Sequence, residues 1–245
     1  MTDIKNFAIV IPARYKSSRF PGKPLVNILG KTMIQHVWER CCLAADKNLV
    51  YIATDDKRIR DVAIQFGAQV VMTSDKCLTG TDRLAEVNEK IKCDLIINVQ
   101  GDEPLVHPED ILLIKDAFIK ERQIINGMSI INTKEEFFSI NIPKVVTRIN
   151  GDLLYISRSP VPINKSSSFT NSYKQVCIYA FGKEHLKFFR ENKDKTPLES
   201  EEDIEILRFL ENGFPIKMIE VFNQTYAVDI PDDLKKIEEI LKNGN

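Results

Sequence analysis

The chain has 245 residues, of which 43% are apolar and 28% charged, so its composition is that of a globular protein. Its 34 basic and 35 acidic side chains give a formal net charge of −1, which excludes an overall positive field able to hold nucleic acid or an anionic membrane. No apolar run approaches the ~18 residues that cross a bilayer, so we expect no membrane insertion.

The first half of the chain alternates β-branched apolar runs with amphipathic stretches, which predicts strands joined by helices. This alternation is typical of an α/β fold with a mainly parallel sheet and helices on both faces. The predicted strands are Phe7–Ile11, Val50–Ala53, Gln69–Met72 and Leu95–Val99, and the predicted helices are Thr32–Asp46, Lys57–Phe66, Asp82–Lys90 and Pro108–Lys120.

The middle of the chain predicts a β-hairpin. Two strands, Lys144–Ile149 and Leu153–Ser157, flank Asn150-Gly151, a dipeptide favoured in type I′ turns. Residues 160–170, rich in proline and serine, form either a plain surface loop or one that covers substrate or contacts a second subunit. A further apolar strand follows at Gln175–Phe181. We therefore expect a single domain, residues 1–245, with a β-rich insertion around 144–181.

The last part of the chain carries clear helix signals. Thr196-Pro197-Leu198-Glu199 is a capping box with proline in the first turn, and Asn212-Gly213 is a stop signal. These signals predict one helix between them. A strand at Pro215–Val221 and a helix at Pro231–Lys242 complete the predicted fold.

A basic loop follows the first predicted strand. Residues 5–37 contain no acidic side chain, whereas Arg14, Lys16, Arg19 and Lys23 lie within ten positions of one another. Loops at the carboxyl ends of parallel strands are where α/β sheets bind ligands, and several cationic donors suit triphosphate oxygens. By charge alone, this segment could equally be a solvated loop that ends in the Pro21-Gly22 turn.

The order of residues in this loop adds information. IPARYKSSRFPGKPL, residues 11–25, closely resembles the signature of the 3-deoxy-manno-octulosonate (Kdo) cytidylyltransferase family, also called CMP-Kdo synthetases. The resemblance implies a three-layer nucleotidyltransferase-type fold, CTP and an acidic 3-deoxy-2-ulosonic sugar as substrates, and a homodimer. It also implies nucleotide contacts from Ala13, Arg14, Arg19 and Lys23.

Two further blocks carry aspartates. INVQGDEPLV, residues 97–106, presents Asp102 after an apolar strand, and VDIPDDL, residues 228–234, contains Asp229. Taken alone, the first is a common turn and the second a helix cap. The resemblance implies that both aspartates bind Mg²⁺ and that Gln100 lies beside the substrate; carboxylates are suitable ligands for this cation.

The remaining blocks concern the sugar. In TGTDRLAEV, residues 79–87, the resemblance implies that Gly80 and Thr81 meet the nucleotide and that Arg83 lies at the substrate pocket. YISRSPVP, residues 155–162, offers Arg158 as a fork for the sugar carboxylate. In PLESEEDIEILR, residues 197–208, the i, i+3 spacing predicts that Glu202 and Glu205 share one helix face and, by resemblance, contact the sugar. A solvated acidic face is the alternative for this pair.

One departure from the family pattern affects the predicted sugar pocket. Tyr179 is retained, but Gln175 stands where the family usually has a histidine, and Ile206 where it has glutamine. The sugar is therefore either Kdo or a relative such as 8-amino-Kdo. Two more distant hypotheses stay open: a non-catalytic nucleotide-binding homologue, and a nucleotidyltransferase for a neutral sugar phosphate.

The functional hypothesis is in-line attack of the sugar's anomeric hydroxyl on the α-phosphorus of CTP. Arg14, Lys23, Asp102 and Asp229 form the proposed catalytic set, with Mg²⁺ as cofactor. Five cysteines, none in a C-x-x-C pair, predict reduced thiols and a cytoplasmic protein. No G-x-G-x-x-G or P-loop motif is present, which disfavours a nicotinamide dehydrogenase or a P-loop ATPase.

Overall fold

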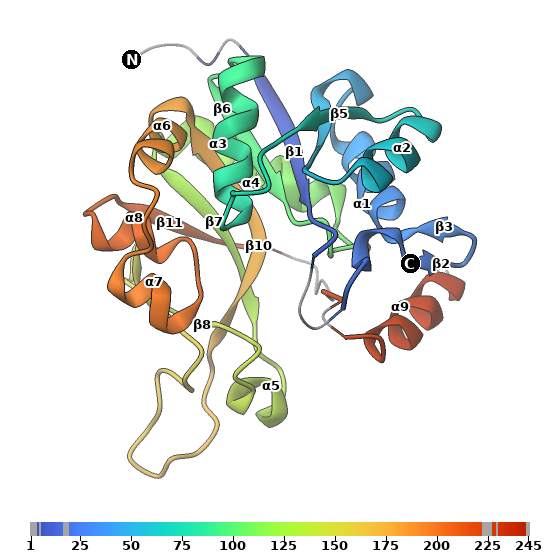
Figure 1. Ribbon diagram of the computed structural model, residues 1–245. Coiled ribbons are helices and arrows are strands. Elements are labelled where there is room, and N and C mark those ends of the chain that lie inside the picture. The colour runs from blue at the N-terminus through green and yellow to red at the C-terminus, as the bar shows by residue number, and fades with distance from the viewer. Residues whose placement is uncertain (1–3, 5, 17–19, 222–226, 229, 244–245) are drawn as a thin grey trace.

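A mixed β-sheet runs through the centre of the computed structural model, which describes residues 4, 6–16, 20–221, 227–228 and 230–243 (Figure 1). Within those residues the sheet has nine strands, and seven follow one another in the order β11-β7-β10-β6-β1-β4-β5. Their bounds are β1 (Phe7–Ala13), β4 (Val50–Thr54), β5 (Gln69–Met72), β6 (Leu95–Val99), β7 (Ile124–Ile130), β10 (Tyr173–Gly182) and β11 (Ile216–Glu220).

The sheet is mainly parallel, with one important exception. Strand β1 is parallel to β4 and β6, β4 is parallel to β5, and β7 is parallel to β11. Strand β10 is inserted antiparallel between β6 and β7. The remaining two strands, β8 (Lys144–Thr147) and β9 (Leu153–Ser157), form a hairpin that joins the sheet through β10.

The core lies on both faces of this sheet. In β1, Ala8 and Val10 belong to one apolar cluster and Ile9 and Ile11 to another, and all four are fully buried. A strand covered on both faces needs no polar alternation, which is why Phe7–Ala13 is an uninterrupted apolar run.

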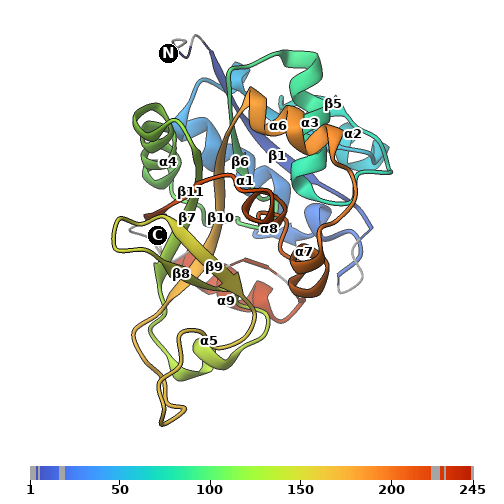
Figure 2. The ribbon, with the colours of Figure 1, turned by 90° about the vertical axis from the view of Figure 1, so that its left-hand side faces the viewer.

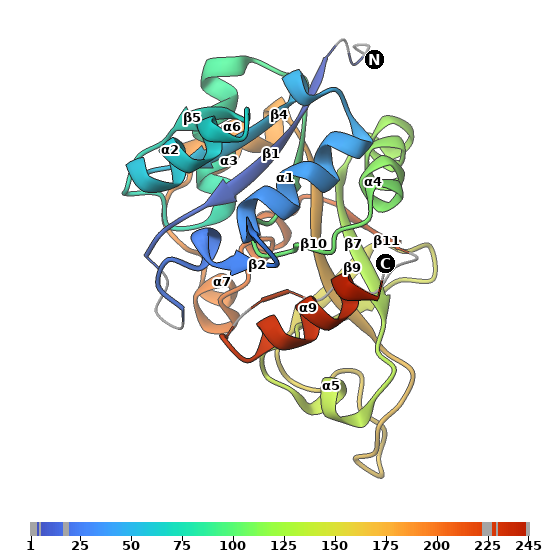
Figure 3. The ribbon, with the colours of Figure 1, turned by 90° about the vertical axis from the view of Figure 1, so that its right-hand side faces the viewer.

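Helices form the two outer layers. The cluster on one face includes residues of α1, α2 and α4, and the cluster on the other includes residues of α3, α6 and α8 (Figures 2 and 3). The helices are α1 (Met33–Ala44), α2 (Lys57–Gln65), α3 (Gly80–Ile91), α4 (Pro108–Glu121), α5 (Lys134–Phe138), α6 (Lys183–Glu191), α7 (Pro197–Glu202), α8 (Leu207–Glu211) and α9 (Asp233–Lys242). The predicted three-layer α/β fold is therefore confirmed. Among the described residues, no helix is long and apolar enough to cross a membrane.

Most predicted elements are confirmed within a few residues. The first four strands and helices of the prediction correspond to β1, β4, β5 and β6 and to α1 to α4. The predicted strands at 175–181 and 215–221 correspond to β10 and β11, and the final helix to α9. The elements not predicted from sequence are β7, α5 and α6, together with four short ones, β2 (Asn27–Ile28), β3 (Lys31–Thr32), η1 (Lys23–Leu25) and η2 (Lys47–Leu49).

The single helix predicted between Thr196 and Asn212 is wrong. Its capping box is present, but the helix stops at Glu202 because Asp203 adopts a left-handed conformation with φ of +50°. A second helix, α8, begins at Leu207 and ends before Gly213, which has φ of +79°. The break separates two short helices and reorients the residues between them.

The type I′ turn predicted at Asn150-Gly151 is also wrong. Gly151 has φ of +88°, but Asn150 does not have the positive φ that a type I′ turn requires. Instead, Arg148 N donates to Asp152 O at 2.8 Å and Gly151 N to Arg148 O at 2.9 Å. These bonds define a three-residue loop with glycine in the left-handed position, and β8 accordingly ends at Thr147.

A fully buried ion pair ties the helices of one layer together. The Arg208 guanidinium donates to both carboxylate oxygens of Glu199, at 2.7 and 2.6 Å, and both side chains are 0% exposed. The same guanidinium donates to Asn192 O at 3.0 Å and lies 3.8 Å over the centre of the Phe189 ring. Through Arg208, the α6, α7 and α8 segments are fixed to one another.

We predict that Arg208→Met lowers the free energy of unfolding by ~3–5 kcal/mol, because it leaves the buried Glu199 charge uncompensated. Urea unfolding followed by circular dichroism measures this loss. The control is Lys187→Met, which removes an i, i+4 pair with Glu191 whose side chains are 75% and 62% exposed. The control should change stability by less than about 0.5 kcal/mol. Equal losses in the two variants would contradict the prediction.

Candidate functional site

A cavity of about 640 Å³ opens where β1 and β6 end. The residues that follow these two strands line one side of it, together with the start of α3. The amino-terminal half of β10 and the loop before β8 line the other side. The cavity therefore lies at the carboxyl edge of the parallel strands, the usual ligand position in an α/β sheet.

Most of the residues singled out from the sequence meet in this cavity. Those that line it are Ala13, Arg14, Lys23, Gly80, Arg83, Gln100, Asp102, Arg158, Gln175, Tyr179 and Glu205. Thr81 and Glu202 do not line it but bond to residues that do. Arg19 and Asp229 lie outside the described residues.

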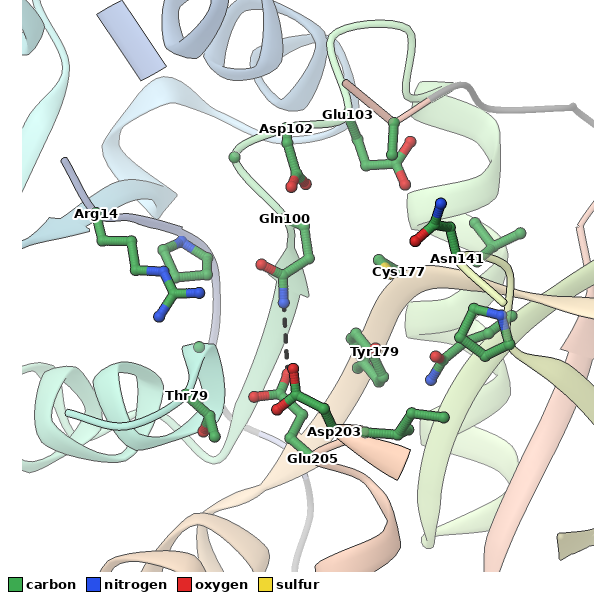
Figure 4. Close-up of a pocket in the computed structure, with 18 of the residues that line it drawn as sticks. Arg14, Thr79, Gln100, Asp102, Glu103, Asn141, Cys177, Tyr179, Asp203 and Glu205 are labelled. Carbon is green, nitrogen blue, oxygen red and sulfur yellow. Dashed lines mark hydrogen bonds between the residues drawn. The ribbon is translucent and has the colours of Figure 1, made fainter. Parts of the chain in front are cut away.

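The cavity has two distinct ends (Figure 4). Arg14 and Thr79 lie on one side of Gln100 and Asn141 lies on the other. Because Arg14 comes from the end of β1 and Asn141 from the loop before β8, the two ends are built by segments far apart in the sequence.

Asp102 owes its position to a close approach of two backbones. A Cβ at Gly101 would lie 2.7 Å from Pro12 O, so only glycine lets the chain after β6 pass this close to β1. The next residue, Asp102, then faces the cavity, where Lys23 Nζ lies 2.7 Å from its Oδ2. The prediction from sequence that a carboxylate is presented at the end of this strand is confirmed.

The carboxyl-terminal part of the chain returns to the same point. Val228 N donates to Asp102 O at 2.9 Å, and Lys23 Nζ donates to Val228 O at 2.6 Å. Helix α9 follows and packs beside β2 (Figure 3). Asp229, the next residue in the sequence after Val228, lies outside the described residues.

The described residues contain no group of three or more His, Cys, Asp or Glu side chains placed to hold a metal ion. Asp102 nevertheless supplies a carboxylate on the cavity wall, and the carbonyl oxygen of Val228 lies nearby, where it accepts from Lys23 Nζ. Such hard oxygen donors fit Mg²⁺ better than a softer metal.

The start of α3 lines the cavity between Arg14 and Glu205 (Figure 4). Thr79 and Asp82 make a capping box in which Asp82 N donates to Thr79 Oγ1 at 3.3 Å, so the helix begins at Gly80. A Cβ at Gly80 would meet the Gln100 side chain at 3.0 Å. The amino terminus of a 12-residue helix favours anionic ligands, which adds to the positive charge of Arg14 and Lys23.

Glu205 lies at the floor of the cavity. Its carboxylate accepts from Thr81 N at 3.0 Å and from Gln100 Nε2 at 3.4 Å (Figure 4). Burial raises the pKa of Glu205 above its ordinary value of 4.5, although the hydrogen bonds from Thr79 and Thr81 oppose the shift. The surroundings of this carboxyl group therefore disfavour its ionised form.

The prediction that Glu202 and Glu205 share a helix face is wrong, because the left-handed Asp203 separates them. Glu202 instead accepts from Tyr155 OH at 3.1 Å and from Arg158 N at 2.7 Å, and Ser157 also donates to it. Burial alone would raise the pKa of Glu202, but these hydrogen bonds outweigh it and the pKa is lowered. Glu202 anchors the end of β9 instead of facing the cavity.

Arg158 lies in the cavity wall, as the sequence predicts, but its guanidinium is engaged by backbone. Its nitrogens donate to the carbonyl oxygens of Glu202, Ile140 and Asp203, the last two at 3.0 and 3.2 Å. Arg83 is similar: its side chain is 4% exposed, donates to Thr73 Oγ1 at 2.7 Å and lies 3.0 Å from Asp55 Oδ1. Arg158 therefore holds segments of the wall in place, whereas Arg83 ties α3 to the residues that follow β4 and β5.

Gln175 is fixed by Asn126, a residue that was not predicted to belong to the site. Gln175 Nε2 donates to Asn126 Oδ1 at 2.9 Å, and Asn126 Nδ2 donates in turn to Val176 O and Ile178 O at 2.8 and 3.0 Å. These carbonyls lie at a register shift between β10 and β7. Asn126 within an apolar run was the available sequence signal, but its partners are 50 positions away.

Further cavity residues were also not predicted. Lys174 Nζ pairs with Glu136 Oε1 at 2.6 Å, and both line the wall. Cys177 is half-buried in β10 beside the predicted Tyr179, which is buried, and burial raises the pKa of both groups. Lys174 and Cys177 stand in the same sequence block as Gln175 and Tyr179, but no property of that block assigned them a role.

We predict that Glu205→Gln changes how stability depends on pH. Because the folded-state pKa of Glu205 is raised, its contribution to stability is present below the ordinary value of 4.5 and is lost as pH rises toward the folded value. Glutamine cannot ionise, so the Tm of the variant minus that of the wild type should increase from pH 4.5 to 8. Thermal unfolding measures this difference, with exposed Glu191→Gln as the control. A difference that stays constant with pH would refute the assignment.

Comparisons with known proteins agree with this geometry. A family model described as cytidylyltransferase matches residues 8–237. A 3-deoxy-manno-octulosonate cytidylyltransferase of Geobacter metallireducens is 44% identical over 95% of this chain and 96% of its own. The mitochondrial one of Arabidopsis thaliana is 42% identical over 96% of this chain and 83% of its own. The solved structure of CMP:2-keto-3-deoxy-manno-octonic acid synthetase complexed with CTP has a TM-score of 0.88 at 36% identity, covering 98% and 100% of the two chains.

Proposed function

This chain belongs to the cytidylyltransferase family, and we propose that it transfers CMP from CTP to the anomeric hydroxyl of Kdo, releasing pyrophosphate. The observation that carries the proposal is one cavity that contains Asp102 and has two ends of different chemistry. One end presents Arg14, Lys23 and the start of α3, which suit a triphosphate. The other presents polar side chains from β10 and the loop before β8, which suit a sugar acid.

In this reaction the sugar oxygen forms a bond to the α-phosphorus while the bond to the departing pyrophosphate breaks. The protein has little covalent chemistry to perform, so positioning and charge neutralisation supply the acceleration. Arg14 and Lys23 bind phosphate oxygens, with Arg19 and the backbone of Ala13, Gly80 and Thr81 as further proposed nucleotide contacts. Gln100, Arg83, Arg158, Gln175, Tyr179, Glu202 and Glu205 are the proposed sugar-side residues; Arg158 and Glu202 act there by holding the wall.

We propose Mg²⁺ as the cofactor, with Asp102 and Asp229 as its protein ligands. When bound, the cation would neutralise charge on the phosphates. Support comes from the contact of Val228 with Asp102, which brings the segment that precedes Asp229 to the aspartate after β6. The ammonium of Lys23 on Asp102 is compatible with a carboxylate that requires a positive partner.

The same site supports 8-amino-Kdo as an alternative acceptor. The specific observation is Gln175, which replaces the family's usual histidine and is held by Asn126. An amide at this position offers both a donor and an acceptor without a titratable charge. A changed hydrogen-bonding group in the acceptor pocket is a reasonable basis for a changed sugar preference.

The direct test is pyrophosphate release from CTP in the presence of Mg²⁺, with Kdo, 8-amino-Kdo, sialic acid and no sugar compared in parallel. We expect release with Kdo, and preference for 8-amino-Kdo would favour the alternative. Replacing CTP with UTP, GTP or TTP should abolish most of the activity. Measurable CTP binding with no release from any sugar would instead indicate a non-catalytic nucleotide-binding homologue.

In the same assay, Asp102→Asn and Asp229→Asn should each reduce kcat by at least ~10²-fold, since each removes negative charge from the proposed metal site. The control is Asp152→Asn, which pairs with Lys217 outside the cavity and should retain near-normal activity. Addition of a chelator should abolish turnover by the wild type. Near-normal Mg²⁺-dependent turnover in either cavity variant would remove that residue from the proposed role.

We also propose a homodimer formed through the β-rich part of the chain, residues 130–163. This segment exposes several large apolar side chains: Ile130, Phe138, Ile140, Ile149, Leu154 and Ile163. Exposed apolar side chains concentrated in one region are typical of interaction sites. For the compartment, we propose the cytoplasm, because all five cysteines are unbridged thiols, as expected in a reducing environment.

Sedimentation velocity tests the dimer. We expect a dimer at micromolar concentration, and a monomer for the double variant Ile149→Asp and Leu154→Asp. The control is Leu43→Asp on α1, where an exposed leucine, 71% accessible, lies outside the proposed interface. A wild type that sediments as a monomer would overturn the proposal.

A further inference from the structure

Lys144, the first residue of β8, is a charged side chain with no exposed surface. Its Nζ donates to three backbone carbonyls, those of Ser139 and Ile142 at 2.7 Å and that of Arg158 at 2.5 Å. An ammonium has three N–H donors, so three acceptors use all of them. The side chain therefore joins the loop before β8 to the end of β9.

Burying the Lys144 ammonium costs desolvation free energy, which argues that the lysine does more than fill space. Burial lowers the pKa of Lys144 to about 8; the nearby Arg158 adds to the shift and Glu202 opposes it. The group is still mainly protonated at pH 7 and keeps its three donors. An apolar side chain of similar length would avoid the desolvation cost but would remove a donor from three part-buried carbonyls, of which Ser139 O would keep only the 3.3 Å bond from Ile142 N.

Arg158 extends the same set of contacts. Its guanidinium donates to the carbonyls of Ile140, Glu202 and Asp203, while its own carbonyl accepts from Lys144. The two cations together hold six carbonyl oxygens. These carbonyls belong to three segments, namely the loop before β8, the end of β9, and the turn between α7 and α8.

The loop that Lys144 holds forms the far wall of the cavity. Ser139, Asn141, Ile142 and Pro143 all line the cavity, and Asn141 lies on the opposite side of Gln100 from Arg14 (Figure 4). Pro143 O also accepts from Gln175 N at 3.0 Å, so the loop is connected to the part of β10 that faces the cavity. The three hydrogen bonds of Lys144 thus all go to the acceptor side, and none goes to β1, η1 or α3, which build the nucleotide end.

We infer that Lys144 is a positioning residue for the acceptor sugar, which fixes the 139–143 loop and Gln175 without touching either substrate. The inference rests on the proposed cytidylyl transfer to a sugar acid and assigns this lysine to one of its two substrates. Because the lysine acts only on the sugar end, its loss should affect the two substrates differently.

The test is steady-state kinetics of Lys144→Met, with CTP and Kdo varied in turn. We expect the KM for Kdo to rise at least ~10-fold, because a displaced wall misplaces the acceptor. The KM for CTP should stay within about twofold, since the nucleotide end is built by other segments. Lys144→Gln, which retains two N–H donors, should give a smaller rise for Kdo than the methionine variant.

The matched control is Lys217→Met. Lys217 Nζ also donates to a carbonyl of the β8–β9 hairpin, that of Asn150 at 2.6 Å, but it does not line the cavity. This variant should leave both KM values within about twofold of the wild type. The control separates the effect on the acceptor wall from a general loosening of the hairpin.

Three results would overturn the inference: an unchanged KM for Kdo in Lys144→Met, equal rises for Kdo and CTP, or failure of both Lys144 variants to fold. Equal rises or unfolding would show that Lys144 serves the fold as a whole. A wild type that transfers CMP to no sugar would instead refute the proposed function, so the two failures are distinguishable.

Discussion

The antiparallel insertion of β10 between β6 and β7 is the constraint on which the site depends. Tyr179 pairs with Asn98 and Ile178 with Val99, so the earlier residues of β10 extend past the end of β6. Those residues, Lys174 to Cys177, therefore reach the edge where β1 and β6 deliver Arg14 and Asp102. A parallel β10 would end at this edge instead of beginning there, and the acceptor wall would have no strand to support it.

Three cationic side chains hold segments of the chain that the sheet itself does not order. Arg208 fixes α7 and α8 against α6, and Lys144 and Arg158 fix the loop before β8 and the turn after α7. Arg208 and Lys144 have no exposed surface, so burying their charge is costly, and removing either one leaves buried or part-buried acceptors uncompensated. Their common property is that they hold backbone carbonyls of irregular segments, which strands and helices cannot order. The segments held by Lys144 and Arg158 are ones that line the cavity.

Parts of the fold were predictable because their causes are local. Strands β1, β4 and β6 are buried at nearly every position, and such strands are continuous apolar runs in the sequence. Strand β5, at the edge of the sheet, is only partly buried, but its Val70-Val71 pair still favours a strand. Strand β7 was missed because Asn126 and Gly127 interrupt its run, and the bonds that justify Asn126 come from β10. The break at Asp203 has no local signal, yet it separates Glu202 from Glu205.

The candidate site also has a part that was predictable from sequence and a part that was not. The juxtaposition of Lys23 and Asp102 follows from a rule about the carboxyl ends of parallel strands, so residues 79 positions apart were assigned to one site from sequence. The engagement of Arg158 by carbonyls, the anchoring of Gln175 by Asn126 and the three carbonyls around Lys144 were not foreseen. All three depend on where distant backbone and side-chain groups lie in three dimensions, which neither residue type nor spacing determines.

Everything proposed for this chain requires one cavity with two ends. The nucleotide end is formed by Arg14, Lys23 and Asp102, and the acceptor end by Asn141 and Gln175. A crystal structure with CTP and Mg²⁺ bound examines this arrangement without intermediate assumptions. We predict triphosphate density against Arg14, Lys23 and the start of α3, with the Asn141 end left open for the sugar. Triphosphate density at the Asn141 end, or nucleotide bound outside this cavity, would show that the two ends are wrongly assigned.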